Sequence, residues 1–167
     1  MIVMMVGMML PGALPQIARR GLVFGTGYMF VWAVVGAVAA VVQFELDRAG
    51  LLSEAMALRS IPLAALVVAG VGLYQLTPSK RARLVSCRVH GANTTGMLSG
   101  VRYGVSCVGC CWALMALLFV TGMMNVVALV AITAFIAAEK MLPRGAAIAK
   151  LAGIALVAGS VVIPLAR

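Results

Sequence analysis

The sequence predicts an all-α integral membrane protein, a bundle of about five transmembrane helices that forms a single domain over residues 1–167. Two observations support this fold class. Apolar residues make up 64% of the chain and charged residues only 10%, and the apolar residues gather in long stretches between short charged segments. Because soluble domains carry about 25% charged residues, so much apolar surface must face lipid. The composition excludes a soluble enzyme, a secreted disulfide scaffold and a disordered chain.

Each apolar stretch approaches or exceeds the ~20 residues that a transmembrane helix needs. In the first stretch Pro11 and Pro15 should kink the helix, and the absence of a charged head before a short apolar core predicts a structural span, not a cleaved signal. Thr77 and Pro78 end the third stretch. The fourth is longer than one span requires and should be tilted. The expected spans cover residues 1–18, 22–44, 58–76, 105–138 and 146–165, with a basic loop over 77–104.

The net charge of +9 has a simple explanation in a membrane protein. Basic residues are concentrated in the cytoplasmic loops of such proteins. Here they lie at span ends and in one loop without interleaved aromatic residues, so nucleic-acid binding is not expected.

Five spans place the connections alternately on two sides of the bilayer. One side would hold eight basic residues and no acid: Arg19, Arg20, Lys80, Arg81, Arg83, Arg88, Arg102 and Arg167. The other would hold five basic residues and all four acids: Arg48, Arg59, Lys140, Arg144 and Lys150 with Glu45, Asp47, Glu54 and Glu139. This asymmetry predicts an N-terminus outside and a C-terminus in the cytoplasm.

A group of three cysteines is the strongest chemical signal. Cys107, Cys110 and Cys111 open the fourth stretch at helical spacings of three and four residues, so their thiols should share one face within a turn near the membrane boundary. Met115 continues that face. Soft sulfur ligands suit Cu(I) best and Zn(II) next. The alternative is that these are small buried residues in a tight helix seam beside Gly104.

Paired methionines give a second signal. Met8 and Met9 lie halfway along the first stretch, and Met123 and Met124 lie halfway along the fourth. If those helices touch, four thioethers meet near the bilayer midplane, next to Asn125, whose polar side chain needs a partner at that depth. The alternative is that these methionines only fill space in the core.

The basic loop contains Cys87 and, three residues later, His90, the one histidine in the chain. Cys87 is a candidate metal ligand, and His90 could be a second. The sequence has no Ser/His/Asp arrangement, no paired intramembrane carboxylates and no glycine-rich phosphate loop. Hydrolysis and phosphoryl transfer are therefore not expected.

Several motifs resemble those of the bacterial predicted metal-binding integral membrane proteins. The matching stretches are VMMVGMMLPGALP at 3–15, GLYQLTPSKR at 72–81, CVGCCWALMALLFVTGMMN at 107–125 and EKMLP at 139–143. The resemblance implies a multi-span bundle in a bacterial plasma membrane with a sulfur-rich metal site, copper being the usual metal. Relatives generally have a further span before the first motif, and many have a cysteine where this chain has Arg83.

These observations favour a copper-handling membrane protein that delivers, sequesters or transfers Cu(I), with no catalysis by the chain itself and with a protein partner in the membrane. The candidate ligands are Cys107, Cys110, Cys111, Met115, Cys87, Met8, Met9, Met123 and Met124. One alternative is a quinone-linked thiol-disulfide oxidoreductase. Another is an accessory subunit of a larger membrane complex, without a metal.

Overall fold

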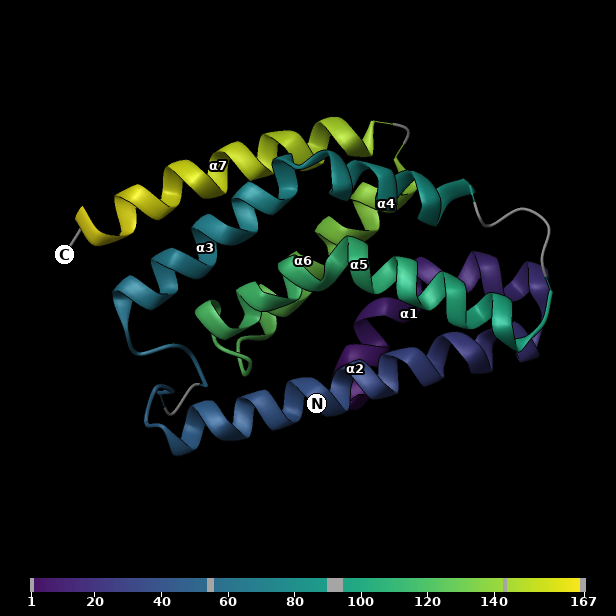
Figure 1. Cartoon of the computed structure of the whole chain (residues 1–167), viewed down its shortest axis with the longest axis horizontal. Coiled ribbons are helices and arrows are strands. Elements are labelled where there is room, and N and C mark those ends of the chain that lie inside the picture. Colours follow the sequence, from purple (N-terminus) through teal and green to yellow (C-terminus); the bar gives the residue numbers. More distant parts are fainter. Residues whose placement is uncertain (1, 54–55, 90–94, 143, 166–167) are drawn as a thin grey trace.

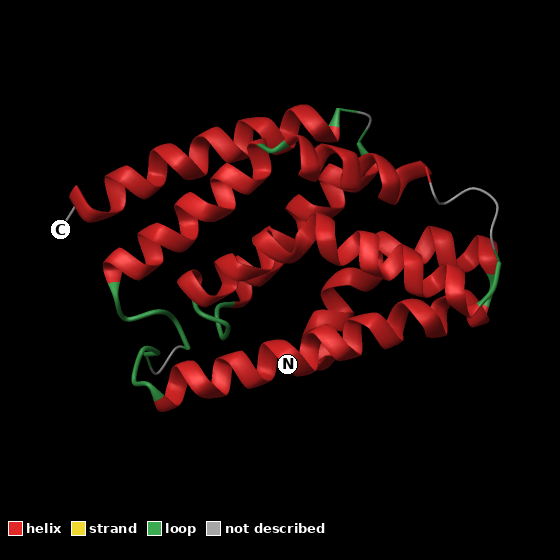
Figure 2. Cartoon of the chain, in the orientation of Figure 1, coloured by secondary structure: helices red, strands yellow, loops and turns green. Residues whose placement is uncertain are grey.

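The computed structural model describes residues 2–53, 56–89, 95–142 and 144–165, and the regular structure in these ranges is helical apart from one isolated bridge between Leu52 and Leu58 (Figures 1 and 2). His90, Glu54 and Arg167 lie outside the described residues. The described helices are α1 (Ile2–Arg20), α2 (Leu22–Arg48), α3 (Ile61–Leu76), α4 (Pro78–Val89), α5 (Met97–Thr121), α6 (Val126–Met141) and α7 (Gly145–Leu165).

Three helices in the described part of the chain, α2, α5 and α7, are long and apolar enough to cross a membrane. α3 and α4 together make a fourth candidate span, which is bent by 67°. α1 packs along α2 and also contacts α6. The expected all-α class with candidate membrane spans is thus confirmed, but the described residues provide three such spans, or four with the bent pair, where about five were expected.

The bend between α3 and α4 lies at Thr77, where the sequence predicted the end of a span. The Thr77 hydroxyl donates to the carbonyl of Tyr74 (2.7 Å) and accepts from the backbone N–H of Lys80 (3.3 Å), so one side chain serves the end of α3 and the start of α4. Pro78 occupies the first position of α4, where its missing N–H leaves no helical bond unmade. Residues 78–89, expected as part of a loop, are therefore a helix.

The stretch 105–138, expected as one long span, contains two helices. α5 ends at Gly122, whose φ of 89° is in the left-handed region that favours glycine. Asn125 then caps α6, because its side chain accepts from the backbone N–H of Ala128 (3.1 Å). This is the partner that the Asn125 side chain needs. The chain reverses here, and α5 itself starts eight residues earlier than expected, at Met97.

The reversal changes which connections share an end of the bundle. A buried ion pair joins Lys80 to Glu139, so the end of α6 lies beside the start of α4. The opposite end contains the loop after α2, where the backbone N–H of Leu58 donates to the carbonyl of Phe119 near the end of α5. α7 therefore runs away from the Lys80 end, not toward it, which differs from the C-terminal placement expected for five spans.

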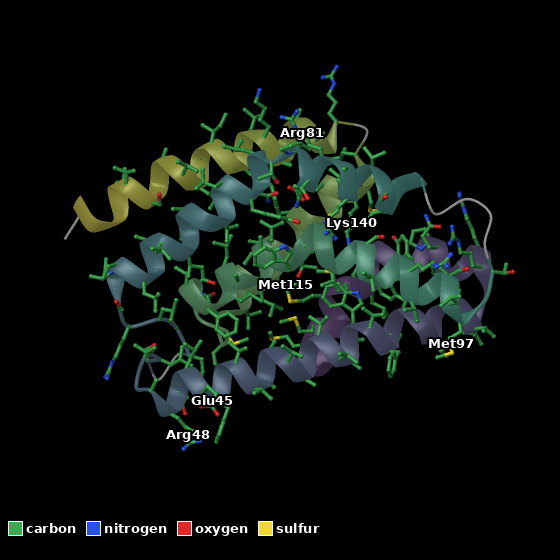
Figure 3. All side chains as sticks on the ribbon, in the orientation of Figure 1. Glu45, Arg48, Arg81, Met97, Met115 and Lys140 are labelled. Atoms are coloured by element: carbon green, nitrogen blue, oxygen red, sulfur yellow. The ribbon has the colours of Figure 1, made fainter. Side chains whose placement is uncertain are left out.

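The half of the bundle that contains the end of α1, all of α4, the start of α5 and the end of α6, called the basic end below, consequently carries most of the positive charge. Its described members are Arg19, Arg20, Lys80, Arg81, Arg83, Arg102, Lys140, Arg144 and Lys150, with Glu139 as the acid. At the other end are Glu45, Asp47, Arg48 and Arg59 (Figure 3 labels Glu45 and Arg48). Lys140, Arg144 and Lys150 had been expected on the side of the acids. They lie at the basic end because the chain reverses at 122–125.

The core lies where α1, α2, α4, α5 and α6 meet, and it is rich in sulfur and aromatic rings. Tyr28 and Tyr103 pack with their ring centroids 5.6 Å apart. Close approach of α2 and α5 depends on Gly100, since a Cβ there would overlap the carbonyl of Phe24. This contact allows the cysteine face of α5 to be fully enclosed.

Candidate metal centre

The cysteines of α5 lie in the middle of the helix and not at its start. Cys107, Cys110 and Cys111 are 0%, 1% and 0% exposed, and they begin ten residues after Met97, the first residue of α5. At ~1.5 Å per residue this places the first thiol about 15 Å along the helix. The expected shared face is present, but it is buried in the core and does not sit at the boundary of the span.

The four thiols lie close together in a row across two helices. Along the row Cys107 neighbours Cys111, Cys111 neighbours Cys110, and Cys110 neighbours Cys87 of α4. Cys87 is itself 4% exposed, and all four are free thiols. Within the described ranges no group of three or more His, Cys, Asp or Glu side chains is arranged to hold a metal ion. The described residues therefore gather the sulfur atoms in one place without forming a preassembled site of three ligands.

A lysine and a tyrosine enclose one end of the thiol row. The ammonium of Lys140, in the last turn of α6, donates to the sulfur of Cys107 at 2.8 Å and lies 3.9 Å from the thioether sulfur of Met9. The hydroxyl of Tyr28 lies 3.5 Å from the same cysteine sulfur and donates to the carbonyl of Met9 (3.2 Å). Residues from α1, α2, α5 and α6 thus converge on Cys107.

A buried ion pair flanks the other part of the row. The Lys80 ammonium donates to the Glu139 carboxylate at 2.9 Å and to the carbonyl of Cys110 at 2.7 Å. The Gln75 amide donates to the second carboxylate oxygen (3.3 Å). Lys80 and Glu139 are both 0% exposed. This pair ties α3, α4 and α6 to the backbone of the cysteine segment.

A cavity of about 410 Å³ reaches the thiol row from the basic end. Cys87 and Lys140 both line it, together with Gly12, Pro15, Gln16, Arg19, Tyr103 and Met141. Figure 3 shows Lys140 inside the bundle, with its side chain between the helices. The row therefore has an opening beside basic residues, although its sulfur atoms are buried.

The methionines divide into buried and exposed members. Met8, Met9 and Met115 are buried in the same core as the cysteines, and sulfur atoms gather in the interior beside Met115 (Figure 3). Met123 is also buried, but Met124 is 72% exposed at the turn between α5 and α6. Met124 therefore lies outside the buried sulfur group that contains the other three methionines of the two pairs.

Sequence reasoning did not identify Lys140, Lys80, Tyr28 or Glu139 as neighbours of the cysteines. Lys80 was interpreted as a surface charge and Glu139 was expected at the opposite face. A signal was present, since charged residues next to a long apolar stretch are costly in a bilayer unless they are paired. Glu139 and Lys140 lie beside the cysteines because the chain reverses at Gly122, and the sequence did not predict this reversal.

A family model matches residues 2–163, almost the whole chain, and the family is PpoB2, described as a copper chaperone. No curated protein and no solved structure matches the chain. The match names copper, the metal implied by the motif resemblance, as the cargo of the family.

Proposed function

The chain belongs to the PpoB2 family of copper chaperones, and we propose that it carries copper as Cu(I) on the thiol row of Cys87, Cys110, Cys111 and Cys107. Its function is copper delivery within a membrane. The observation that carries the proposal for the site is the grouping of four buried, free thiols from two helices in one core cluster.

The chemistry of the row suits Cu(I) better than other ions. Thiolate and thioether ligands select soft ions, whereas Mg(II) and Ca(II) require oxygen ligands. Cu(I) is stable with two sulfur ligands, so each pair of neighbouring thiols is a sufficient site. A row of overlapping pairs lets the ion move by exchanging one ligand at a time. Met9 and Met115 extend the sulfur lining beyond the cysteines.

Copper enters or leaves the row, in this proposal, through the cavity at the basic end. Cys87 lines that cavity and is in contact with Cys110, so it is the member of the row nearest to an outside donor or acceptor. Delivery requires a partner molecule, and we place the exchange with a partner protein at this opening.

We further propose that the basic end faces the cytoplasm. The clustered positive charge lies at the end of α1, in α4, near the start of α5 and around the end of α6, and the positive-inside rule places such a cluster on the cytoplasmic side. We further infer that α1 and α6, which are not among the candidate spans, also cross the bilayer, so that the start of α1 and the end of α7 lie on the outer side. This retains the expected outside N-terminus and reverses the expected cytoplasmic C-terminus.

The test is copper binding by the purified protein in lipid nanodiscs under reducing conditions. The parent protein should retain Cu(I), and X-ray absorption at the copper edge should show sulfur ligands only. The double variant Cys107→Ser/Cys111→Ser should lose at least tenfold in affinity, since hydroxyl oxygen is a poor ligand for Cu(I). Met124→Leu is the matched control, because Met124 is exposed and remote from the row, and it should bind as the parent does.

Two results would overturn the assignment. Unchanged copper stoichiometry and affinity in the folded double variant would exclude the thiol row as the site. Nitrogen or oxygen ligands in the X-ray absorption spectrum of the parent would exclude an all-sulfur site. Circular dichroism of both variants shows whether the helices are retained.

A further inference from the structure

The ammonium group of Lys140 occupies a position lined by sulfur. It lies 2.8 Å from the Cys107 sulfur and 3.9 Å from the Met9 sulfur, and the Tyr28 hydroxyl completes the enclosure at 3.5 Å from the same cysteine sulfur. A thiol and a thioether are weak hydrogen-bond acceptors. They are, however, good ligands for a soft cation. A cation therefore already sits where Cu(I) would find two sulfur ligands.

Copper and the ammonium cannot use the Cys107 sulfur in the same way at the same time. Cu(I) held by the Cys107 and Met9 sulfur atoms would lie in the space between them, which the Lys140 ammonium now fills at 2.8 Å and 3.9 Å from the same two atoms. Binding of copper at Cys107 thus requires the ammonium to leave.

The Lys140 side chain has space into which it can move. It passes over Gly12 of α1, where the position of an added Cβ would be 3.6 Å from the Lys140 Cδ and 3.9 Å from its Nζ. Beyond it is the cavity of about 410 Å³ that Lys140 itself lines, beside Gln16 and Met141. A rotation of the flexible four-carbon side chain moves the ammonium into that cavity without any shift of the backbone.

We propose that Lys140 is a tethered cation that holds the copper position at Cys107 in the metal-free chain and competes with copper for it. This inference rests on the proposed thiol row as the copper site. When Cu(I) binds, the Cys107 thiol gives its proton to water in the cavity, the Cu–S bond forms to the resulting thiolate, and the ammonium moves to the cavity and is solvated there. When it returns to Cys107, it promotes release of the ion. Copper stays Cu(I) throughout, and the ammonium keeps its charge.

The first test compares Cu(I) affinity and release for Lys140→Gln and Lys150→Gln in nanodiscs, with the Cu(I) chelator bathocuproine disulfonate as competitor. Lys150 is an exposed lysine near the start of α7, so it controls for loss of charge at the basic end. Lys140→Gln should bind at least tenfold more tightly, equivalent to 1.4 kcal/mol, and should release copper at least tenfold more slowly. Lys140→Arg, which keeps a cation, should remain closer to the parent than Lys140→Gln does.

Equal or weaker binding by folded Lys140→Gln would overturn the proposal. The proposed function would survive that result if Cys107→Ser/Cys111→Ser still loses copper. Absence of copper binding in the parent protein would instead overturn the proposed function.

A second test uses the unmodified sequence and so does not depend on how a variant folds. A water-soluble amine-acylating reagent is applied to the protein with and without Cu(I), and labelled peptides are quantified by mass spectrometry. Labelling of Lys140 should rise at least threefold when copper is bound, because the ammonium then lies in the open cavity, while labelling of Lys150 stays constant. No change at Lys140 on copper binding would contradict the movement.

Discussion

The buried pair of Lys80 and Glu139 allows a quantitative test of how the cysteine segment is held. Their charged atoms are 2.9 Å apart and neither residue is exposed. At that distance the attraction is ~6 kcal/mol for an effective dielectric constant of about 20, and it is opposed by the desolvation of both groups. Removal of one partner leaves a buried charge without its counterion, which costs about 3–5 kcal/mol.

Lys80→Met should therefore lower the free energy of unfolding by about 3–5 kcal/mol. It removes the ion pair and also the hydrogen bond to the carbonyl of Cys110. Glu139→Gln should destabilise by a similar amount, since it leaves the Lys80 ammonium buried. The double variant should be more stable than either single variant, because no charge is then left unpaired.

The assay is equilibrium unfolding in detergent, followed by circular dichroism, for the parent, both single variants and the double variant. The double-mutant cycle should give a coupling energy of about 2 kcal/mol or more. Additive effects, or single variants within about 1 kcal/mol of the parent, would refute the conclusion that this pair anchors the helices around the cysteines.

Two further predictions concern topology and packing. Reporter fusions after Arg20 and after Arg144 should both read cytoplasmic and a fusion after Arg48 should read external, because the reversal at 122–125 puts Arg144 at the same end as Arg20. A cytoplasmic signal after Arg48 would contradict the proposed orientation. Gly100→Ala should destabilise the protein by about 1–3 kcal/mol in the same unfolding assay, since the added Cβ overlaps α2. Gly70→Ala is the control, because Gly70 is exposed on a helix with open space around it, and it should leave stability unchanged or raise it. Equal effects of the two substitutions would exclude close packing at Gly100.

Local periodicity explains why part of the candidate site could be predicted from sequence. The spacing of Cys107, Cys110 and Cys111 determines that they share a helix face wherever the helix begins. Thr77 and Pro78 predicted a helix end because proline disfavours helical geometry in the residue before it. The burial of Cys87 was missed, since the basic residues around it gave the segment the composition of a loop.

The tertiary neighbours of the cysteines could not be predicted in the same way. Hydropathy shows that 105–138 is apolar, but it does not show that Gly122 adopts a positive φ and reverses the chain. Because sides of a membrane alternate, one missed reversal moved every later charge to the wrong end. Lys140 was consequently expected far from Cys107, which it contacts.

The adjacent charges at the end of α6 have different environments, and this difference bears on how copper could exchange. The Glu139 carboxylate is held by Lys80 and Gln75, so the backbone of this turn is anchored to α3 and α4. Lys140, the next residue, contacts sulfur and faces a cavity. Its side chain can therefore move while its helix stays fixed. At the proposed site, copper exchange at Cys107 would then need a side-chain rotation only, and the apolar helices around it would remain packed.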